Sequence, residues 1–133
     1  MITVEHAQYI PGVCNIGPEE RRARRMVGWL GLVITVVAWV LLAYLGLALM
    51  WYLVIFLSAS LSASGFIQDR MHFCANFGMR HVFNFGPEVG DTDAVMQREF
   101  WAADRRKAIR ILVYSLLWGV LTTGAAILLR RFF

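Results

Sequence analysis

Charged side chains are missing from long parts of this sequence. No Asp, Glu, Lys, Arg or His occurs between Met26 and Ile67, and none occurs between Ile111 and Leu129. One transmembrane helix needs about 20 predominantly apolar residues, so the first run is long enough for two helices and the second for one. With 59% hydrophobic residues overall, the chain also exceeds the roughly 45–50% that is typical of soluble domains. The sequence therefore predicts an all-α membrane protein with three transmembrane helices.

The predicted spans also lack the ionisable side chains that usually mark proton relays, ion paths and coupled transport. They contain no histidine, so no imidazole is available to hold a haem or a chlorin inside the bilayer. These two absences argue against a transporter, a pump and a pigment-carrying subunit. Outside the spans, no nucleophile and base stand in a recognisable catalytic pattern, and we expect no enzymatic activity.

The first uncharged run is expected to form a helical hairpin that turns near Gly46. Tyr44, Trp51 and Tyr52 flank this glycine, and such rings gather at the membrane interface. A helix is expected to begin at Pro18 and to continue into the first span, because proline is favoured in a first helical turn. Residues 1–133 then form a single membrane domain: a segment at 1–26, a hairpin at 27–67 with spans at 27–45 and 48–67, a loop at 68–110 and a third span at 111–129.

Basic residues are unevenly divided among the segments that flank the spans. Four arginines precede the first span, seven basic residues lie between the second and the third, and two arginines follow the last. Because the chain crosses three times, the first two groups share one side of the membrane, and the positive-inside rule makes that side cytoplasmic. The N-terminus is then cytoplasmic and the C-terminus outside. The basic residues expected at the cytoplasmic membrane surface are Arg21, Arg22, Arg24, Arg25, Arg105, Arg106 and Lys107.

The net charge of +4 does not by itself indicate a nucleic-acid partner. Basic side chains beside a membrane are attracted to anionic lipid headgroups, and no nucleic-acid-binding fold pattern accompanies the charge here. The expected partners are therefore the lipid bilayer and other membrane protein subunits.

Small residues recur at helical spacing in each predicted span. They are Gly31 and Thr35 in the first span, Ser58, Ser62 and Gly65 in the second, and Ser115, Gly119 and Thr123 in the third. Small side chains let two helix backbones approach closely, and hydroxyls can hydrogen-bond a neighbouring helix. These faces predict either packing among the three spans, which is the simpler interpretation, or contact with another subunit.

The loop at 68–110 is expected to contain an interfacial helix that leads into the third span. Asp91 or Asp93 could cap its start, and a basic cluster at 105–107 suits the headgroup region. The apolar residues expected to face the membrane are Val95, Met96, Phe100 and Trp101. A shorter helix is expected to begin at Asp69 and to end with a glycine cap at Gly78.

The segment "RMHFCANFGMRHVFNFG", residues 70–86, holds four phenylalanines and one of the two cysteines. Full burial of one phenylalanine side chain contributes about 1.5–3 kcal/mol, so this segment is expected to pack on the cytoplasmic ends of the spans. The phenylalanines expected to pack there, around a buried Cys74 that lies close to Cys14, are Phe73, Phe77, Phe83 and Phe85.

The cysteines also allow a chemical interpretation. Both are expected on the cytoplasmic side, where thiols normally stay reduced. Together, Cys14, His72, Cys74 and His81 would supply the thiolates and imidazoles of a tetrahedral zinc site. The spacing lacks the paired cysteines of structural zinc sites, so no resident cofactor is predicted. Cys14 precedes a helix start and four arginines, surroundings that lower a thiol pKa and would suit a persulfide acceptor.

Residues Cys14 to Gly78 resemble the two-helix hairpin domain of small bacterial inner-membrane proteins, which is also attached to some membrane-bound rhodaneses. The matching motifs are Asn15-Ile16-Gly17 with the arginines after it, Gly65-Phe66, and Phe73-Cys74. The chain departs from that pattern in lacking a proline after the second cysteine, in having a third span and in having no rhodanese domain. That hairpin domain has no established activity, so the resemblance implies a topology, a bacterial inner-membrane location and a link to sulfur or redox partners.

Two classes of function follow from these features. The first is a non-catalytic accessory or assembly subunit of a larger membrane protein complex, which the ion-free spans and the several small-residue faces favour. The alternative is a cytoplasmic-face thiol module that transfers sulfur or binds a metal through Cys14 and Cys74.

Overall fold

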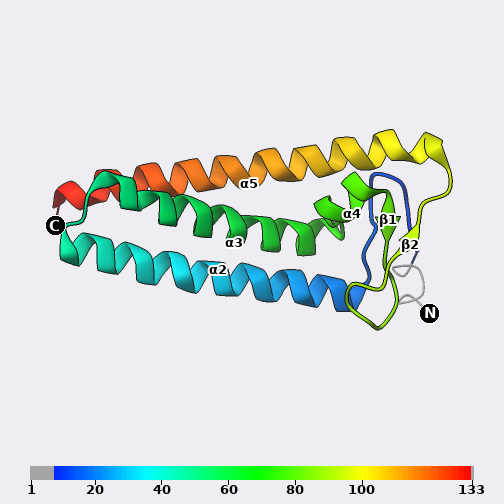
Figure 1. The fold of residues 1–133 in the computed structure, drawn as a ribbon, viewed down its shortest axis with the longest axis horizontal. Coiled ribbons are helices and arrows are strands. Elements are labelled where there is room, and N and C mark those ends of the chain that lie inside the picture. The colour runs from blue at the N-terminus through cyan, green and yellow to red at the C-terminus, as the bar shows by residue number, and fades with distance from the viewer. Residues whose placement is uncertain (1–7, 133) are drawn as a thin grey trace.

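Three long helices dominate the computed structural model, which describes residues 8–132. They are α2 (Pro18–Leu45), α3 (Leu53–Met71) and α5 (Trp101–Leu129). The helices lie side by side with α3 in the middle, packed against both α2 and α5 (Figure 1). All three are long and apolar enough to cross a membrane, which confirms the sequence-based prediction at that level.

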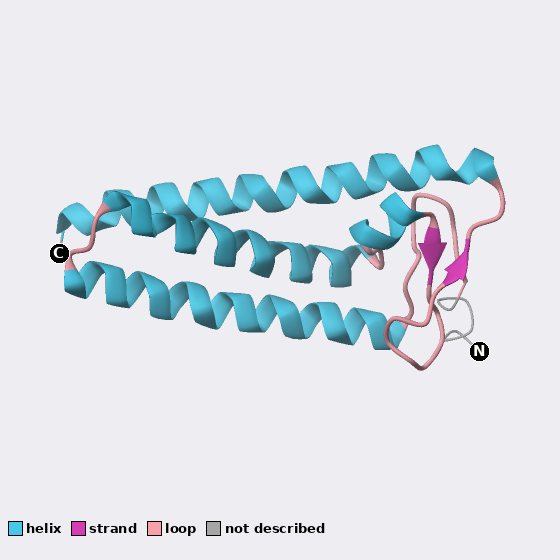
Figure 2. Ribbon diagram, in the orientation of Figure 1, coloured by secondary structure: helices cyan, strands magenta, loops and turns pink. Residues whose placement is uncertain are grey.

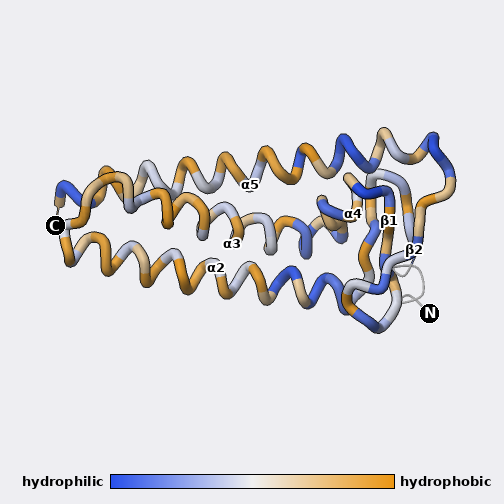
Figure 3. The backbone as a smooth tube through the Cα atoms, viewed as in Figure 1, coloured by the Kyte–Doolittle hydropathy of each residue, from blue (hydrophilic) through white to orange (hydrophobic). Residues whose placement is uncertain are grey.

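The remaining elements are short, and most of them gather at one end of the helices. There lie α4 (Ala75–Arg80) and a two-stranded antiparallel ribbon of β1 (Val82–Phe83) and β2 (Asp93–Ala94), the only strands among the described residues (Figure 2). Single 3-10 turns precede α3 and α5 and follow α5, namely η1 (Leu49–Tyr52), η2 (Arg98–Phe100) and η3 (Arg130–Phe132). We call residues 8–17 and 72–100 the cap. Figure 3 shows apolar residues along the long helices and polar ones concentrated in and beside the cap.

The ends of the first helix agree with the sequence-based expectation. Pro18 occupies its first turn, where its missing N–H costs nothing because no intrahelical partner exists there. At the other end Gly46 adopts a left-handed conformation with φ of 63°, and its N–H donates to the carbonyl of Leu42. Glycine takes up this conformation without steric cost, so α2 stops at the predicted hairpin turn.

The predicted interfacial helix is wrong in its first half. Residues 91–97 contain no helix: β2 lies there, and the N–H of Val95 donates to the carbonyl of His81. The indole of Trp101 donates to the carbonyl of Val95 and holds the same segment extended. Met96 is 79% exposed while Val95 is 3% exposed, so the two do not share a face. Tertiary hydrogen bonds therefore override the capping signal at Asp91 and Asp93, and the helix begins at Trp101.

The predicted helix from Asp69 to Gly78 is also wrong. α3 continues through Asp69 to Met71 and is ended by His72 in a left-handed conformation, and a separate helix, α4, contains Gly78. A Cβ on Gly78 would lie 2.7 Å from the ring of Phe73. The glycine is thus required by a close aromatic contact and does not end the helix.

The contact between α2 and α3 brings two backbones together. A Cβ added to Gly65 would lie 2.5 Å from the carbonyl oxygen of Arg24 and 2.5 Å from the nitrogen of Gly28. Nearby, the hydroxyl of Ser62 donates to the carbonyl of Gly28 at 2.7 Å. A Cβ on Gly31 would likewise meet the backbone of Ser62 at 2.8 Å. The small residues of these two helices are therefore used for packing within the chain.

A second close contact joins α3 to α5. A Cβ on Gly119 would collide with the hydroxyl of Ser60 and lie 3.1 Å from the carbonyl oxygen of Phe56. The hydroxyls of Ser115 and Thr123 donate to carbonyls one turn earlier in their own helix. Between α2 and α3, the hydroxyl oxygen of Thr35 lies 2.7 Å from the carbonyl oxygen of Gly31 and 2.8 Å from the hydroxyl oxygen of Ser58. Gly31, Thr35, Ser58, Ser62, Gly65 and Gly119 thus lie at contacts between the helices of this chain.

Replacing Gly65 by alanine should destabilise the helix layer, because the new methyl group meets backbone atoms that cannot rotate away. Overpacking of this kind costs about 1–3 kcal/mol. Gly124→Ala is the matched control, since a Cβ there meets nothing within 4 Å and alanine favours a helix over glycine by about 1 kcal/mol. Free energies of unfolding measured by SDS titration in mixed micelles should separate the two variants, and equal values would contradict the assigned contact.

Candidate functional site

Residues 15–17, the part of the cap that leads into α2, form a short extended segment that lies between two other parts of the cap. The side-chain amide of Asn15, which is fully buried, donates to the carbonyl of Cys74 and accepts from the N–H of Cys74. On the other side, the N–H of Asn84 donates to the carbonyl of Asn15, and the N–H of Gly17 donates to the carbonyl of Asn84. This segment therefore fixes where α2 begins relative to α4 and β1.

A buried carboxylate lies directly after this segment. Glu20, in the first turn of α2, is 1% exposed. Its Oε2 accepts from the side-chain amide of Asn84 at 2.8 Å and from the N–H of Gly90, and its Oε1 pairs with Arg24 at 3.2 Å. The positive end of the helix dipole also favours a carboxylate here. Glu20 thus binds the 84–90 loop to the start of α2.

Arg24 lies beside this carboxylate, and its side chain is 21% exposed. Its Nη2 is 3.2 Å from Glu20 and 3.0 Å from the Sγ of Cys74, and its guanidinium lies 5.5 Å from the centre of the Phe77 ring. Sequence reasoning assigned Arg24 to the membrane surface with its three neighbours. Its i, i+4 spacing from Glu20 was the available signal for an ion pair, whereas no local pattern indicated the thiol contact.

A second buried carboxylate joins the N-terminal part of the cap to α5. Asp104 is fully buried and accepts from the hydroxyl of Tyr9 and, at 2.8 Å, from the N–H of Gly12. Burial, and then the hydrogen bond to Asp104, raise the pKa of Tyr9 well above its ordinary value, so the phenol stays a donor. Asp104 precedes the 105–107 basic cluster in the sequence, where a solvated carboxylate is the usual expectation.

The phenylalanine-rich segment packs as predicted in its first half. Phe73 is fully buried against α5, and Phe77 is 5% exposed beside Ile16 and Cys74. Phe83 and Phe85 are half-buried, and Phe83 stacks on Tyr9 with ring centres 5.1 Å apart. Burial of Phe73 and Phe77 follows from their apolar area, while Phe85 lies against Gly17 and Phe83 against Tyr9.

The two cysteines are both buried free thiols. Burial raises the pKa of Cys14, although a backbone hydrogen bond from Ile10 acts in the opposite direction. The expectation that the helix start and the arginines lower this pKa is therefore wrong. The physical reason is that Cys14 is removed from water, and the arginine that does reach a thiol, Arg24, contacts Cys74.

The four residues considered as zinc ligands are not assembled into one site. Among residues 8–132, no group of three or more His, Cys, Asp or Glu side chains is placed to hold a metal ion. His81 stacks on Trp101 with ring centres 4.2 Å apart, and the thiol of Cys14 donates to the carbonyl of Gln8. His72 ends α3 in a left-handed conformation.

The basic residues divide into two groups with different surroundings. Near the start of α2, Arg21 and Arg25 both pair with Asp69, and Arg24 pairs with Glu20. Within the described part of the chain no ion pair involves the basic residues near the start of α5, Arg105, Arg106, Lys107 and Arg110. Three of the arginines of α2 thus have carboxylate partners, whereas these basic residues of α5 form no ion pair within residues 8–132.

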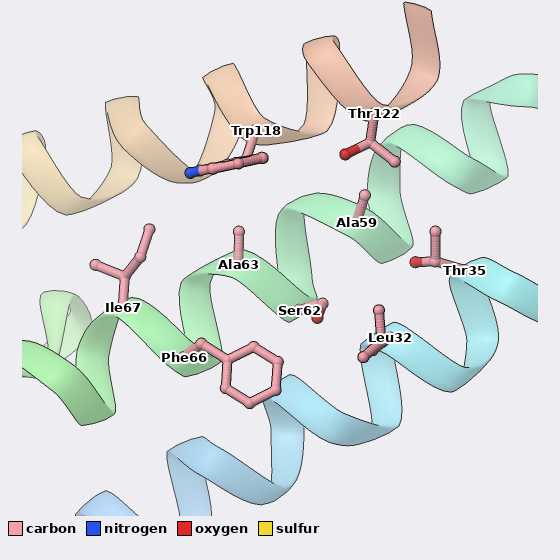
Figure 4. Close-up of a pocket in the computed structure, with 9 residues that line it drawn as sticks. All are labelled: Leu32, Thr35, Ala59, Ser62, Ala63, Phe66, Ile67, Trp118 and Thr122. Atoms are coloured by element: carbon pink, nitrogen blue, oxygen red, sulfur yellow. The ribbon is translucent and has the colours of Figure 1, made fainter. Parts of the chain in front are cut away.

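A groove of about 290 Å³ runs over α3 between α2 and α5. Its floor is made of the small residues Ala59, Ser62 and Ala63, and its walls include Thr35 from α2 and Trp118 and Thr122 from α5. Phe66 and Ile67 close the end toward the cap. In Figure 4, Trp118 and Thr122 project from α5 toward the alanines of α3. The groove exists because α3 separates the two outer helices along this stretch.

No protein-family model, curated protein or solved structure matches this chain. The resemblance of residues 14–78 to the hairpin domain of membrane-bound rhodaneses therefore stays a prediction.

Substitution of Asn15 by alanine should destabilise the cap, because it leaves the buried N–H of Cys74 without a partner and removes one of the two donors to the Cys74 carbonyl, the other being the N–H of Gly78. An unsatisfied buried group costs about 1–3 kcal/mol. Asn76, which is exposed on α4, provides the matched control, and Asn76→Ala should change stability by less than about 0.5 kcal/mol. Equal unfolding free energies for the two variants in detergent would show that the 15–17 segment does not hold the cap.

Cys14 should behave as an unreactive thiol. In a Cys74→Ala variant, the rate of iodoacetamide alkylation should reach half of its maximum at a pH above 9.0, the ordinary value from which the Cys14 pKa is raised. The same variant unfolded in SDS serves as the control, since its thiol is hydrated and should titrate at a lower pH. A midpoint in the folded protein below that of the unfolded chain would contradict the burial argument.

Proposed function

We propose that this protein is a non-catalytic accessory or assembly subunit that packs against a larger membrane protein complex in the bacterial cytoplasmic membrane. Its three long helices would span that membrane, with the cap and the N-terminus in the cytoplasm and the C-terminus outside. The charge distribution supports this orientation, because two arginines, Arg130 and Arg131, follow the last apolar run, whereas the remaining basic residues precede the first run or lie in the 68–110 loop.

The observation that carries this proposal is the groove over α3. In a bilayer, helices associate through small residues that permit close approach and through hydroxyls that bond across the contact. Most of the small residues of α2, α3 and α5 that we expected at helix contacts already pack against another helix of this chain. Ala63 on the groove floor is different, because it stays partly exposed, whereas Ala59 beside it is only 7% exposed. We infer that one further helix packs over Ala63.

A transmembrane helix of a partner subunit suits this groove better than a lipid chain. The hydroxyl of Thr122 lines the groove and makes no hydrogen bond within residues 8–132, and Trp118 beside it is 58% exposed. An acyl chain offers no acceptor for a hydroxyl or an indole N–H, whereas polar side chains on a neighbouring helix do. The groove therefore provides both the space and the polar groups that a helix contact uses.

The polar groups of the cap support a structural role. The carboxylates of Glu20 and Asp104 and the amides of Asn15 and Asn84 are buried and engaged in hydrogen bonds within the chain. Buried polar groups satisfied in this way stabilise a unique arrangement. The thiol alternative, by contrast, loses the lowered Cys14 pKa on which it depended.

Filling the groove tests the proposal. Ala63→Leu places a larger side chain on the groove floor and should release the protein from its complex, because the added atoms occupy the position of the partner helix. Ala125→Leu is the matched control, since Ala125 is exposed on α5 and does not line the groove. Both variants would be produced in the native host, solubilised in mild detergent and compared by native electrophoresis.

The expected result is that wild type and Ala125→Leu migrate in one complex of defined size, while Ala63→Leu migrates as the free chain. Thermal unfolding of the three purified proteins distinguishes loss of a partner from loss of the fold. If the wild-type protein migrates alone, or if Ala63→Leu stays in the complex while folded, the proposed role of the groove is wrong.

A further inference from the structure

A small basic pocket lies where the N-terminal part of the cap meets α5. It has a volume of about 240 Å³ and is lined by Pro11 and Gly12 on one side and by Ala103, Arg106, Lys107 and Arg110 on the other. The three basic residues lie on one face of α5, because residues three and four positions apart are neighbours on a helix. No carboxylate is among the lining residues.

The wall opposite these cations is held in place by buried interactions. Gly12 has a positive φ of 69°, and a Cβ there would lie 3.2 Å from the Cβ of Ala103, so the turn lies directly against α5. The N–H of Gly12 donates to Asp104. Asp104 is fully buried and also accepts from Tyr9. The pocket is thus part of a fixed contact between the cap and α5.

The cations of this pocket have no anionic partner in the chain. None of Arg106, Lys107 and Arg110 forms an ion pair within residues 8–132. The arginines of α2 are different, because Asp69 pairs with Arg21 and Arg25, and Glu20 pairs with Arg24. Three cations around one cavity with no carboxylate lining it constitute a site for an anion with several acceptor oxygens.

We propose that this pocket binds the phosphate of an anionic phospholipid headgroup. The inference rests on the proposed membrane insertion, since Arg110 immediately precedes the apolar run of α5 and the pocket would then lie at headgroup depth. Long basic side chains at such a position extend their charged ends toward the phosphates, and each one near an anionic surface contributes to binding. The pocket would hold one lipid against the junction of the cap and α5.

The test is a lipid titration of the full-length, delipidated protein in a neutral detergent, followed by native mass spectrometry. Phosphatidylglycerol is compared with phosphatidylcholine, and inorganic phosphate is added as a competitor. The double variant R106Q/R110Q removes two cations of the pocket. The double variant R22Q/R105Q removes the same charge from exposed arginines outside it. Thermal unfolding confirms that both are folded, and the single variants R106Q and R105Q replace them if a double variant does not fold.

The wild-type protein should retain phosphatidylglycerol in preference to phosphatidylcholine, and R106Q/R110Q should weaken this binding about tenfold or more. The control R22Q/R105Q should stay within about twofold of the wild type, and phosphate should not displace the lipid. Equal weakening in both double variants would overturn the proposal, as would displacement by phosphate, which indicates a site for a soluble anion. Flotation of the protein with phosphatidylcholine vesicles tests insertion separately, so its failure is distinguishable from failure of the pocket.

Discussion

The hydrogen bonds of Asn15 are the interaction on which the rest of the structure depends. Its buried amide satisfies both backbone groups of Cys74, and its own carbonyl accepts from Asn84. An unpaired buried amide is costly, so the segment has one favourable position between α4 and β1. The start of α2 follows from that position, and with it the place of Glu20, which accepts hydrogen bonds from Asn84 and Gly90 of the 84–90 loop. A short polar segment thereby determines how the cap is arranged on three apolar helices.

The middle helix carries a second constraint of a steric kind. Gly65 allows α3 to approach the backbone of α2, and Gly119 allows α5 to approach Ser60 on another face of α3. Because both neighbours are held by α3, the two outer helices stay apart over part of their length and leave the groove of Figure 4. The same small residues that stabilise the chain therefore create the one surface in the proposed membrane region that we assign to a partner. The proposed subunit thus has a cap held by internal hydrogen bonds at one end of its helices and a groove along them that we assign to a partner helix.

Much of the helical part of this fold follows from the sequence, whereas most of the cap does not. Uncharged length predicts three spans, and Pro18 and Gly46 predict the ends of α2, because these signals are local. The extended path of residues 91–97 depends on hydrogen bonds to distant partners such as His81, which no local pattern reveals. From the sequence, Asp104 is expected to be a solvated charge beside a basic cluster. In the structure it is buried, and the distant residues Gly12 and Tyr9 donate hydrogen bonds to it. Local signals thus predict the three long helices, and they fail where polar contacts between distant segments decide the structure.

The central claim is that the cap faces the cytoplasm and the opposite end of a three-span bundle faces outward. The most direct measurement uses single cysteines at two exposed positions, Glu88→Cys in the cap and Arg131→Cys after α5, in a Cys14→Ser, Cys74→Ala background. A membrane-impermeant maleimide is applied to sealed vesicles of known orientation. The account predicts that position 88 is labelled only from the cytoplasmic side and position 131 only from the outside. Labelling of both positions from one side, or of position 88 from the outside alone, would contradict it.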